Sequence, residues 1–297
     1  MTTRDPSGRK GMILLNVLLV VSVAAIMVTL MMTSQEVAID RTVRFREAAQ
    51  ARAYTRAGEV SVIVALRRDA VEASASDHSR EAWRAVEDQN VVIEGGRFSL
   101  KVRDDQAFFN LNSVGSGNPL ARARFARVLE ALGLSDQILD PIVGYVSATG
   151  PLANLGELRV VGLQPAEIET LSQLVAVLPR ETAININAAD ERLLAVLFES
   201  PVTARLLASR RQRLGYLTPA DLSGLNTLVP AGAGFTSNFF TVETEVQVGE
   251  TRQRTASALV RRASPAGAQV VVYSRQSLSA SLAENSGGSN RPQVVSD

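Results

Sequence analysis

The sequence predicts an α+β fold in which a long N-terminal helix is followed by an antiparallel β-sheet, and an all-α domain is inserted between the strands of that sheet. The helix is indicated by an apolar run that continues without glycine or proline into a charged segment. The sheet is indicated by alternating apolar and polar residues on both sides of a central block. That block has helix-capping residues and short connections, which favour a separate helical domain.

Residues 12–32 form the apolar part of the predicted helix. They include no charged residue, glycine or proline, and a helix over this range is about 31 Å long, enough to cross the hydrocarbon core of a bilayer. Arg4, Arg9 and Lys10 precede the run, and no lysine or arginine follows it before Arg41. This distribution predicts a single-pass protein whose N-terminus is cytoplasmic and whose remaining chain lies across the membrane.

Three interpretations of this N-terminus are possible. A cleaved secretory signal peptide is disfavoured, because its apolar region spans about 7–15 residues and ends at small residues, whereas this run ends in Leu30-Met31-Met32. A plain signal anchor stays open, and so does a leader that is cut on the cytoplasmic side of the apolar run. The leader is supported by Arg9-Lys10-Gly11, a basic stretch that ends in glycine and is followed by the hydrophobic Met12.

The helical pattern continues past the membrane run, because residues 33–56 contain no glycine or proline. A continuous helix from Met12 to Arg68 would be about 85 Å long. Its second half has one apolar stripe at spacings of three or four residues, namely Phe45, Ala49, Ala53, Ala57, Val60 and Val64. We expect this stripe to dock on the chain's own sheet, and the first half of the helix to pack against neighbouring subunits.

Period-two patterns predict strands on both sides of the helical block. The expected strands are residues 91–93, 97–103, 108–112, 239–248, 251–262 and 269–274. Before the first strand, residues 74–89 are polar, and we expect a loose segment that contains His78, the only histidine, and is anchored by Trp83. Asp104 and Asp105 are expected to be a solvated strand end rather than a site.

Capping residues indicate several helices in the central block. Asn154 and Glu157 are spaced as a capping box, and Asn187 is expected to cap a helix over residues 188–197. Gly115-Ser116-Gly117 precedes the first of these helices. We expect that tripeptide to be a flexible joint into the block.

The composition excludes several classes of function. The 31 basic and 30 acidic residues nearly balance, so no global positive field attracts nucleic acid. The absence of cysteine excludes disulfides, thiol catalysis and thiolate metal sites, and is compatible with a periplasmic location. Gly115-Ser116-Gly117 has the spacing of neither a nucleophile elbow nor a phosphate-binding loop. We predict no catalytic residue and no enzyme.

The order of these features, together with several short motifs, resembles the K-type minor pseudopilins of type II secretion systems (general secretion pathway protein K). The resemblance covers the chain from about Gly11 to Arg275. Besides the junction of Gly11 and Met12, its motifs are Phe109-Asn110-Leu111-Asn112, Leu152-Ala153-Asn154, Glu157-Leu158-Arg159, Leu178-Pro179 and Ile184-Asn185-Ile186-Asn187-Ala188-Ala189. No single motif is specific, and their order carries the resemblance.

The resemblance implies processing and assembly sites at the N-terminus. A prepilin peptidase would cut after Gly11, and Met12 would become the N-methylated first residue. Most pilin-like subunits have glutamate at the fifth mature position, where its carboxylate meets the N-terminal ammonium of the next subunit within lipid. This chain has Asn16 there, and the K-type family also typically lacks the glutamate, which implies a subunit with no neighbour above it.

The resemblance also implies a pilin-like fold and a structural role at the tip of a short periplasmic pseudopilus, where the protein would initiate assembly and support export across the outer membrane. The implied partners are the minor pseudopilins I and J, the prepilin peptidase, the major pseudopilin below the tip, secreted substrates and the outer-membrane secretin. The implied location is the bacterial inner membrane, with periplasmic C-terminal domains.

The metal site of the family is not carried over to this chain. Many K-type members bind calcium through an acidic loop that sometimes contains cysteine. The corresponding residues 140–150 have one carboxylate and no cysteine, whereas calcium takes six to eight oxygen ligands. We therefore predict no metal and no cofactor.

The expected domain division follows from the strand and helix patterns and from the resemblance. It comprises a leader (1–11), a transmembrane helix (12–32), the first part of a pilin-like domain (33–118), an inserted helical domain of helix-hairpin-helix or SAM-like type (119–235), the C-terminal strands (236–275) and a disordered tail (276–297).

The alternative is a membrane-anchored periplasmic DNA-binding protein. Residues 185–222 resemble helix-hairpin-helix modules, in which the amides of a glycine-rich hairpin bind phosphate. The corresponding hairpin at residues 198–202 has no glycine and contains Glu199 and Pro201, which disfavours nucleic acid. A basic helix face follows, which we expect to be solvated, of Arg205, Arg210, Arg211 and Arg213.

Overall fold

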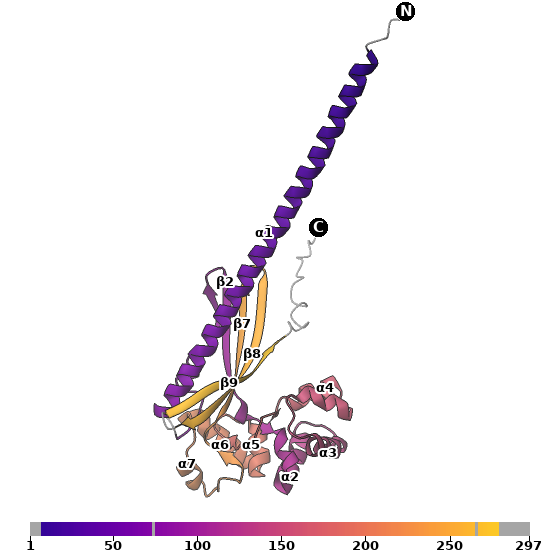
Figure 1. Cartoon of the computed structure of the whole chain (residues 1–297). Helices are drawn as coiled ribbons and strands as arrows, with labels where there is room; N and C mark the ends of the chain where they lie inside the picture. Colours follow the sequence, from indigo (N-terminus) through magenta and orange to yellow (C-terminus); the bar gives the residue numbers. More distant parts are fainter. Residues whose placement is uncertain (1–6, 73–74, 265–266, 279–297) are drawn as a thin grey trace, which may run out of the picture.

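The computed structural model describes residues 7–72, 75–264 and 267–278. Its first element is helix α1 (Ser7–Glu72), which runs without interruption for 66 residues, about 99 Å at the standard rise. Figure 1 shows that α1 projects far beyond the globular part and lies against it only near its C-terminal end. The predicted long helix is confirmed.

A five-stranded antiparallel sheet lies against that end of α1. Its strand order is β1 (Asp88–Ile93), β2 (Gly96–Asp104), β7 (Phe239–Val248), β8 (Thr251–Ser264) and β9 (Gly267–Ser277). Strands β2 and β7 pair directly, with Leu100 opposite Thr244. The two strands that precede the insertion and the three that follow it therefore form one sheet, as the sequence predicts.

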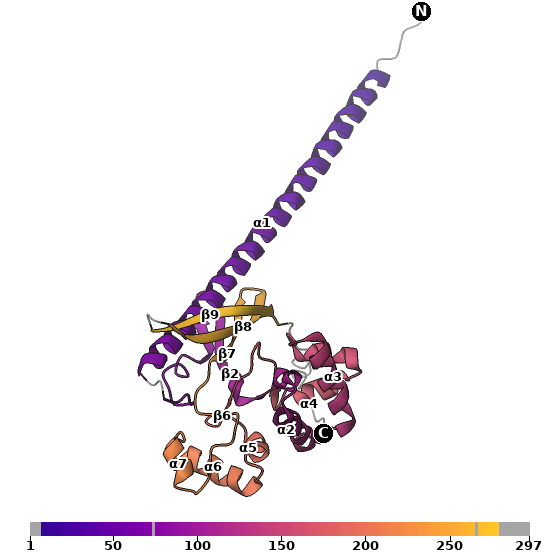
Figure 2. The same ribbon diagram turned by 60° about the horizontal axis from the view of Figure 1, so that its bottom comes forward.

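The inserted block lies between β2 and β7 in the sequence. Its elements are η1 (Asp105–Ala107), β3 (Phe109–Asn110), η2 (Leu111–Ser116), α2 (Pro119–Ala131), η3 (Asp136–Ile138), α3 (Leu139–Thr149), η4 (Leu155–Val161), α4 (Pro165–Leu171), β4 (Val175–Ala176), β5 (Ile184–Asn185), α5 (Glu191–Phe198), α6 (Pro201–Leu214), α7 (Pro219–Ser223) and β6 (Ala233–Gly234). Strand β3 pairs with β4, and β5 with β6, both in parallel. Figures 1 and 2 show the block beyond the end of the sheet that points away from the N-terminal half of α1.

The sheet and the block have separate hydrophobic cores. In the sheet domain, Val62 and Leu66 of α1 and Trp83 pack against Leu100 and Phe240. Trp83 is 2% exposed, which confirms it as the anchor of its segment. The core of the block is built by a different set, which includes Phe125, Leu129, Ile142, Leu158 and Leu171.

The face of α1 that docks on the sheet differs from the predicted one. The buried residues of this part of the helix are Ala51, Thr55, Gly58, Glu59, Val62, Ala65, Leu66 and Asp69. In the predicted stripe, Phe45, Val60 and Val64 are 73%, 49% and 56% exposed. Successive residues turn by about 100° around an α-helix, which places the two sets on opposite sides. The expectation that the stripe docks on the chain's own sheet is therefore wrong.

The segment that enters the block is packed at its start and exposed at its end. The extended pattern expected for residues 108–112 ends at Asn110, whose side chain accepts a hydrogen bond from the Asn112 amide at 3.1 Å and turns the chain into η2. Gly115 lies against α3, because a Cβ at this position would be 2.8 Å from Val146 Cγ1. Ser116 and Gly117 are exposed, so only Gly115 contradicts the expected flexible joint, and flexibility of the other two residues stays a prediction.

One predicted cap is present and another is not. The capping box at the start of η4 is confirmed, although the helix is of the 3₁₀ type. Helix α5 begins later than expected, because Asp190 accepts the hydrogen bond from the Arg192 amide at 2.8 Å. Asn187 instead accepts from the amide of Leu217 at 2.7 Å and donates to its carbonyl at 3.0 Å. The prediction that Asn187 caps α5 is wrong, since its side chain ties two loops together.

The domain boundaries stay a prediction. The hydrophobic core of the block includes Phe109, Leu111 and Val114, which precede the expected start of the inserted domain. Gln276 and Ser277 extend β9, although the sequence places them in the expected tail. The rest of that tail, residues 279–297, lies outside the described residues.

Candidate functional site

The residues predicted to be processed lie near the start of α1. Gly11 and Met12 are helical and precede the residues whose side chains the structure describes. Asn16 follows on the same helix and is exposed. Every residue from Leu15 to Arg46 is exposed as well, so the rest of the described chain leaves this stretch uncovered.

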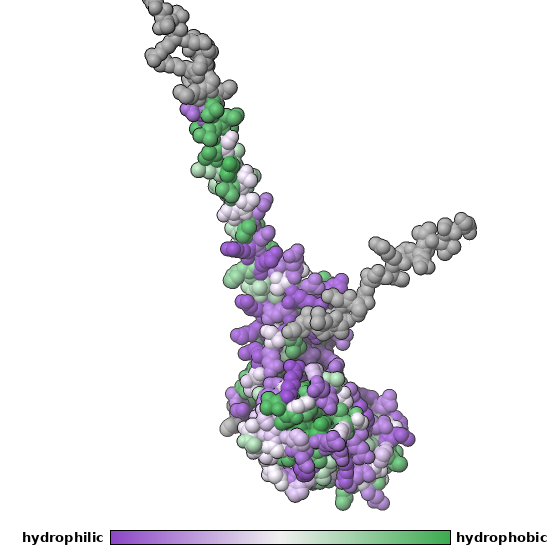
Figure 3. Space-filling view, turned by 90° about the vertical axis from the view of Figure 1, so that its right-hand side faces the viewer, coloured by the Kyte–Doolittle hydropathy of each residue, from purple (hydrophilic) through white to green (hydrophobic). Residues whose placement is uncertain are grey.

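This uncovered stretch is long and apolar enough to cross a membrane. An 18-residue window of the helix has a mean hydropathy of 2.5, and none of that window is buried. Figure 3 shows hydrophobic side chains along this part of α1 and hydrophilic ones nearer the globular part. A single helix of this kind near the N-terminus fits a single-pass membrane anchor.

Closer to the sheet, α1 carries a second uncovered surface. We call it the exposed stripe, and it consists of Phe45, Ala49, Ala53, Ala57, Val60 and Val64, all of which are exposed. Its alanines leave room for the backbone of another helix to approach closely. An apolar helix face that the chain does not cover itself is typical of an interaction surface.

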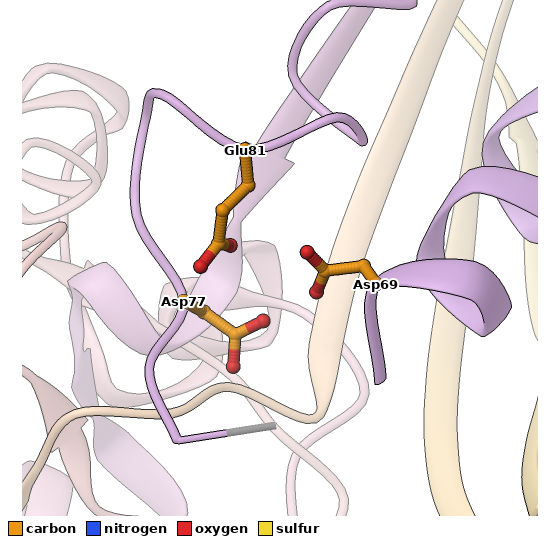
Figure 4. A group of neighbouring side chains, drawn as sticks. All are labelled: Asp69, Asp77 and Glu81. Carbon is orange, nitrogen blue, oxygen red and sulfur yellow. The ribbon is translucent and has the colours of Figure 1, made fainter. Parts of the chain in front are cut away.

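Three buried carboxylates lie where the sheet domain meets the block, and we call this region the joint. Asp69 comes from the last turns of α1, and Asp77 and Glu81 come from the segment that follows it; Figure 4 shows their side chains pointing toward one another. One carboxylate oxygen of each residue lies within 4.8 Å of the others. The three residues are 3%, 1% and 7% exposed.

Arg261 of β8 brings a positive charge into the joint. Its Nη1 lies 3.0 Å from Asp69 Oδ2, and its Nη2 lies 2.6 Å from Asp77 Oδ1. Nη2 also donates to the carbonyl of Ser237, just before β7, at 2.6 Å. The guanidinium thus bridges α1, the segment after it and the sheet. It provides the cation that two buried carboxylates need in order to lie side by side, so a metal ion is not required there.

A fourth buried carboxylate, Asp104, connects the joint to the block. Its Oδ2 accepts hydrogen bonds from Ser237 Oγ at 2.6 Å and from Asn185 Nδ2 at 2.9 Å. Asn185 also donates to the carbonyl of Asp77 at 2.9 Å. Asp104 and Asp105 are 5% and 3% exposed. The expected solvated strand end is therefore wrong, because both carboxylates turn inward to donors of the block and the sheet.

Burial controls the ionisation of the joint. Burial raises the pKa of Asp69 and of Asp104 to about 6, and the pKa of Glu81 to about 7. The negative charge of Asp77 acts in the same direction on all three. These carboxyl groups therefore take up protons closer to neutral pH than ordinary ones do, and the joint carries less negative charge than its composition suggests.

His78 is fixed in place rather than loose. Its ring stacks on Tyr216, with 4.3 Å between the ring centroids, and its Nδ1 accepts a hydrogen bond from the Arg80 amide at 3.2 Å. Burial lowers the pKa of the imidazole. The expectation of a loose segment is wrong here, because Tyr216 follows α6 and the stack joins the segment to the block.

The hairpin between α5 and α6 lacks the features of a phosphate-binding hairpin. Glu199, with φ of 54°, turns the chain between the two helices and pairs with Arg127 of α2 at 2.5 Å. Pro201 is the first residue of α6 and has no amide hydrogen to donate. A carboxylate and a proline thus stand where a DNA-binding hairpin presents amides to phosphate.

The basic face predicted for α6 is only partly solvated. Arg210 pairs with Asp221 at 2.6 Å. Arg211 donates to two backbone carbonyls ahead of α5, at 2.7 and 2.8 Å. The expectation of a solvated face is wrong for these two residues, and it is met by Arg205 and Arg213, which are exposed.

Three curated relatives resemble the chain along most of its length, and each is named type II secretion system protein K. The protein from Pseudomonas aeruginosa is 26% identical over 297 residues, which cover 86% of this chain and 89% of the relative. The protein from Aeromonas hydrophila is 28% identical over 315 residues, covering 86% and 95%. The protein from Klebsiella pneumoniae is 26% identical over 255 residues, covering 71% and 78%.

A solved structure shares the fold of this chain. The match is to a chain in the crystal structure of the GspK-GspI-GspJ complex of the type II secretion system of enterotoxigenic Escherichia coli, with a TM-score of 0.63 and 21% identity. It covers 81% of this chain and 100% of that chain. This likeness supports the predicted pilin-like fold with an inserted helical domain. No family model matches the chain.

Proposed function

Because this chain belongs to the type II secretion system protein K family, we propose that it is the subunit that closes the tip of the type II secretion pseudopilus. The chain is a minor pseudopilin with a pilin-like fold. Its role at the tip is to initiate assembly of the fibre and to support protein export across the outer membrane. That role is structural, and it requires complementary surfaces rather than a catalytic centre.

The position of the helical block carries the proposal of a tip subunit. The block lies beyond the end of the sheet that points away from the N-terminal half of α1 (Figures 1 and 2). Subunits of a pilin-like fibre are held together through their long helices. A further subunit stacked on the side of the block would meet this extra domain before its own helix could pack beside α1.

The exposed stripe supports assembly with other pilin-like helices. It leaves an apolar helix face uncovered on the side opposite the sheet, where it continues toward the membrane-spanning part of α1. The matched crystal structure is that of a complex with GspI and GspJ. We propose the I- and J-type minor pseudopilins as partners of the stripe, and the major pseudopilin as the subunit below the tip. Secreted substrates and the outer-membrane secretin are further proposed contacts.

The N-terminus supports an inner-membrane subunit that a prepilin peptidase processes. Basic residues precede the apolar span, which favours a cytoplasmic N-terminus and periplasmic domains. We propose cleavage after Gly11 and N-methylation of Met12. Asn16 then offers no carboxylate to the N-terminal ammonium of a subunit above, in agreement with a position at the tip.

Mass determination of the mature N-terminus tests the processing directly. In cells that contain the prepilin peptidase, the chain is expected to begin at Met12 and to carry an added methyl group. A chain that retains Met1, or one that is cut beyond residue 32, would contradict the pseudopilin assignment.

Co-purification tests the partners of the exposed stripe. Ala57→Glu places a charge in the middle of the stripe and should reduce recovery of the I- and J-type pseudopilins about tenfold, because an interface would have to bury an unpaired carboxylate. The matched control is Ala220→Glu, which is exposed on α7 of the block, outside the stripe, and should leave recovery unchanged. Equal recovery with both variants would contradict the proposed use of the stripe.

A further inference from the structure

A cavity of about 730 Å³ opens between the sheet domain and the helical block. Arg80 and Arg84 line it from the segment after α1, and Arg103 lines it from the end of β2. Ala208 and Arg211 of α6 line the opposite side. Open cavities of this size at the boundary of two domains are common places for ligands.

The lining of this cavity is predominantly cationic. It includes the four arginines just named, against two carboxylates. One carboxylate is Asp104, whose side chain accepts hydrogen bonds from Ser237 and Asn185 within the joint. The other is Glu191, which lies 3.7 Å from Arg205. Positive groups therefore outnumber the negative groups that could neutralise them inside the cavity.

Two of the four arginines have no carboxylate bonded to them among the described residues. Arg84 and Arg103 each pair with a neighbouring carboxylate, at 3.3 and 2.9 Å. Arg80 donates to two backbone carbonyls, both at 3.3 Å, and Arg211 also donates to two, at 2.7 and 2.8 Å. Asp190 interacts electrostatically with Arg211, but its carboxylate forms an ion pair with Arg192 at 3.1 Å. Arg80 and Arg211 thus offer charge to an incoming anion.

The guanidinium of Arg80 is held in position by the end of α6. It donates to the carbonyls of Gln212 and Leu214 and lies over Gly215, where φ is +100° and a Cβ would be 2.5 Å from Nη1. A side chain at residue 215 would push the guanidinium away. A cation that is already fixed loses less conformational entropy when a ligand binds.

We propose that this cavity docks an acidic segment of a partner protein, whose carboxylates bind Arg80 and Arg211. The cavity is much larger than one carboxylate, and Phe108 and Ala208 give it apolar wall area that suits the carbon atoms of a peptide. Nucleic acid fits less well, because the whole chain has a net charge of only +1, whereas a protein that binds duplex DNA neutralises many phosphates over an extended basic surface. The proposal does not depend on the tip position, so its failure would leave the assignment as a minor pseudopilin unchanged.

The test uses the full chain in detergent micelles and a fluorescein-labelled ten-residue peptide of alternating glutamate and alanine. Fluorescence anisotropy should show saturable binding that weakens with added salt. A peptide with glutamine in place of glutamate should not bind. Arg80→Gln combined with Arg211→Gln should weaken binding at least about fivefold, since two charge pairs are lost. Arg213→Gln combined with Arg262→Gln removes two exposed arginines that do not line the cavity, and it should change binding less than about twofold.

A second variant keeps the test decisive if the double arginine variant fails to fold. Ser209→Glu adds a carboxylate to the lining without removing a hydrogen bond of either arginine, and it should weaken peptide binding by a similar factor. Ser209→Gln is its neutral control and should bind as the original chain does. Binding that neither Ser209→Glu nor the double variant reduces, or equal binding of the glutamine peptide, would overturn the proposal. A short DNA duplex that binds more tightly than the peptide, with the same dependence on Arg80 and Arg211, would overturn it in favour of nucleic acid.

Discussion

The two sides of helix α1 between Phe45 and Asp69 show that an apolar pattern alone does not identify the side that docks on the sheet. The side that docks on the sheet includes Thr55 and Glu59 and is nevertheless buried. The exposed stripe on the opposite side contains only alanine, valine and phenylalanine, and it is uncovered. An apolar helix face that the chain leaves uncovered is typical of an interaction surface, which agrees with the proposed role of the stripe in assembly.

The polar residues of the docked side are buried together with their partners. Both oxygens of Glu59 accept hydrogen bonds from Arg275 of β9 at 2.8 Å, which holds the pKa of Glu59 below its ordinary value. Asp69 bonds Arg261 of β8. Each pair joins α1 to a strand that is about 200 residues away in the chain. The docked side therefore combines apolar packing with specific ion pairs, whereas the exposed stripe has only small and apolar side chains.

The largest expected effect comes from removing the cation of the joint. Arg261→Met leaves Asp69 and Asp77 buried without their shared partner, which should lower the free energy of unfolding by about 3–5 kcal/mol. Urea unfolding of a fragment that starts at residue 33 measures it. The matched control is Arg262→Met, an exposed neighbour on β8, which should cost less than about 0.5 kcal/mol. Equal losses would show that the joint does not hold α1 on the sheet.

A pair of alanine substitutions compares the two sides of α1 at nearly the same position along the helix axis. Leu66 is 0% exposed on the docked side, and Val64 is 56% exposed in the stripe. Leu66→Ala should lower the free energy of unfolding of the same fragment by about 2–5 kcal/mol, and Val64→Ala should change it by less than about 0.5 kcal/mol. If Val64→Ala were the more destabilising substitution, the assignment of the docked face would be wrong.

The joint should also make stability depend on pH, with a smaller effect. The pKa of Asp69 and Asp104, about 6, and of Glu81, about 7, lie above the ordinary carboxyl values of about 4. Their protonated forms therefore favour the folded state, and this contribution is complete below about pH 4 and is lost as pH rises through 6 to 7. Asp69→Asn should reduce the loss of stability between about pH 4.5 and 7.5 by about 1 kcal/mol, measured by urea unfolding. An unchanged pH profile would contradict this origin.

Local patterns were enough to predict the main elements of the fold. The long helix, the split antiparallel sheet and the anchoring by Trp83 follow from periodicity and from short-range signals. The docked face could not be inferred this way, because the amphipathic pattern does not say whether the covering partner is the same chain or another one. The joint likewise cannot be predicted from local patterns, because Asp77 and Arg261 are 184 positions apart in the sequence. Asn187 and Asp104 were misassigned for the same reason, because their bonding partners come from distant loops.

Photocrosslinking from the exposed stripe and from the helical block tests most directly the claim that this chain is a tip subunit that packs through its stripe. The chain has no cysteine, so a single introduced cysteine can be labelled alone with a benzophenone maleimide. The two variants are Ala57→Cys in the exposed stripe and Leu228→Cys in the block, where Leu228 follows α7 and is 88% exposed. Each is labelled in membranes that contain the whole secretion system. A tip subunit that packs through its stripe should form adducts with other pseudopilins from residue 57 and none with them from residue 228. Pseudopilin adducts from residue 228 and none from residue 57 would contradict the account.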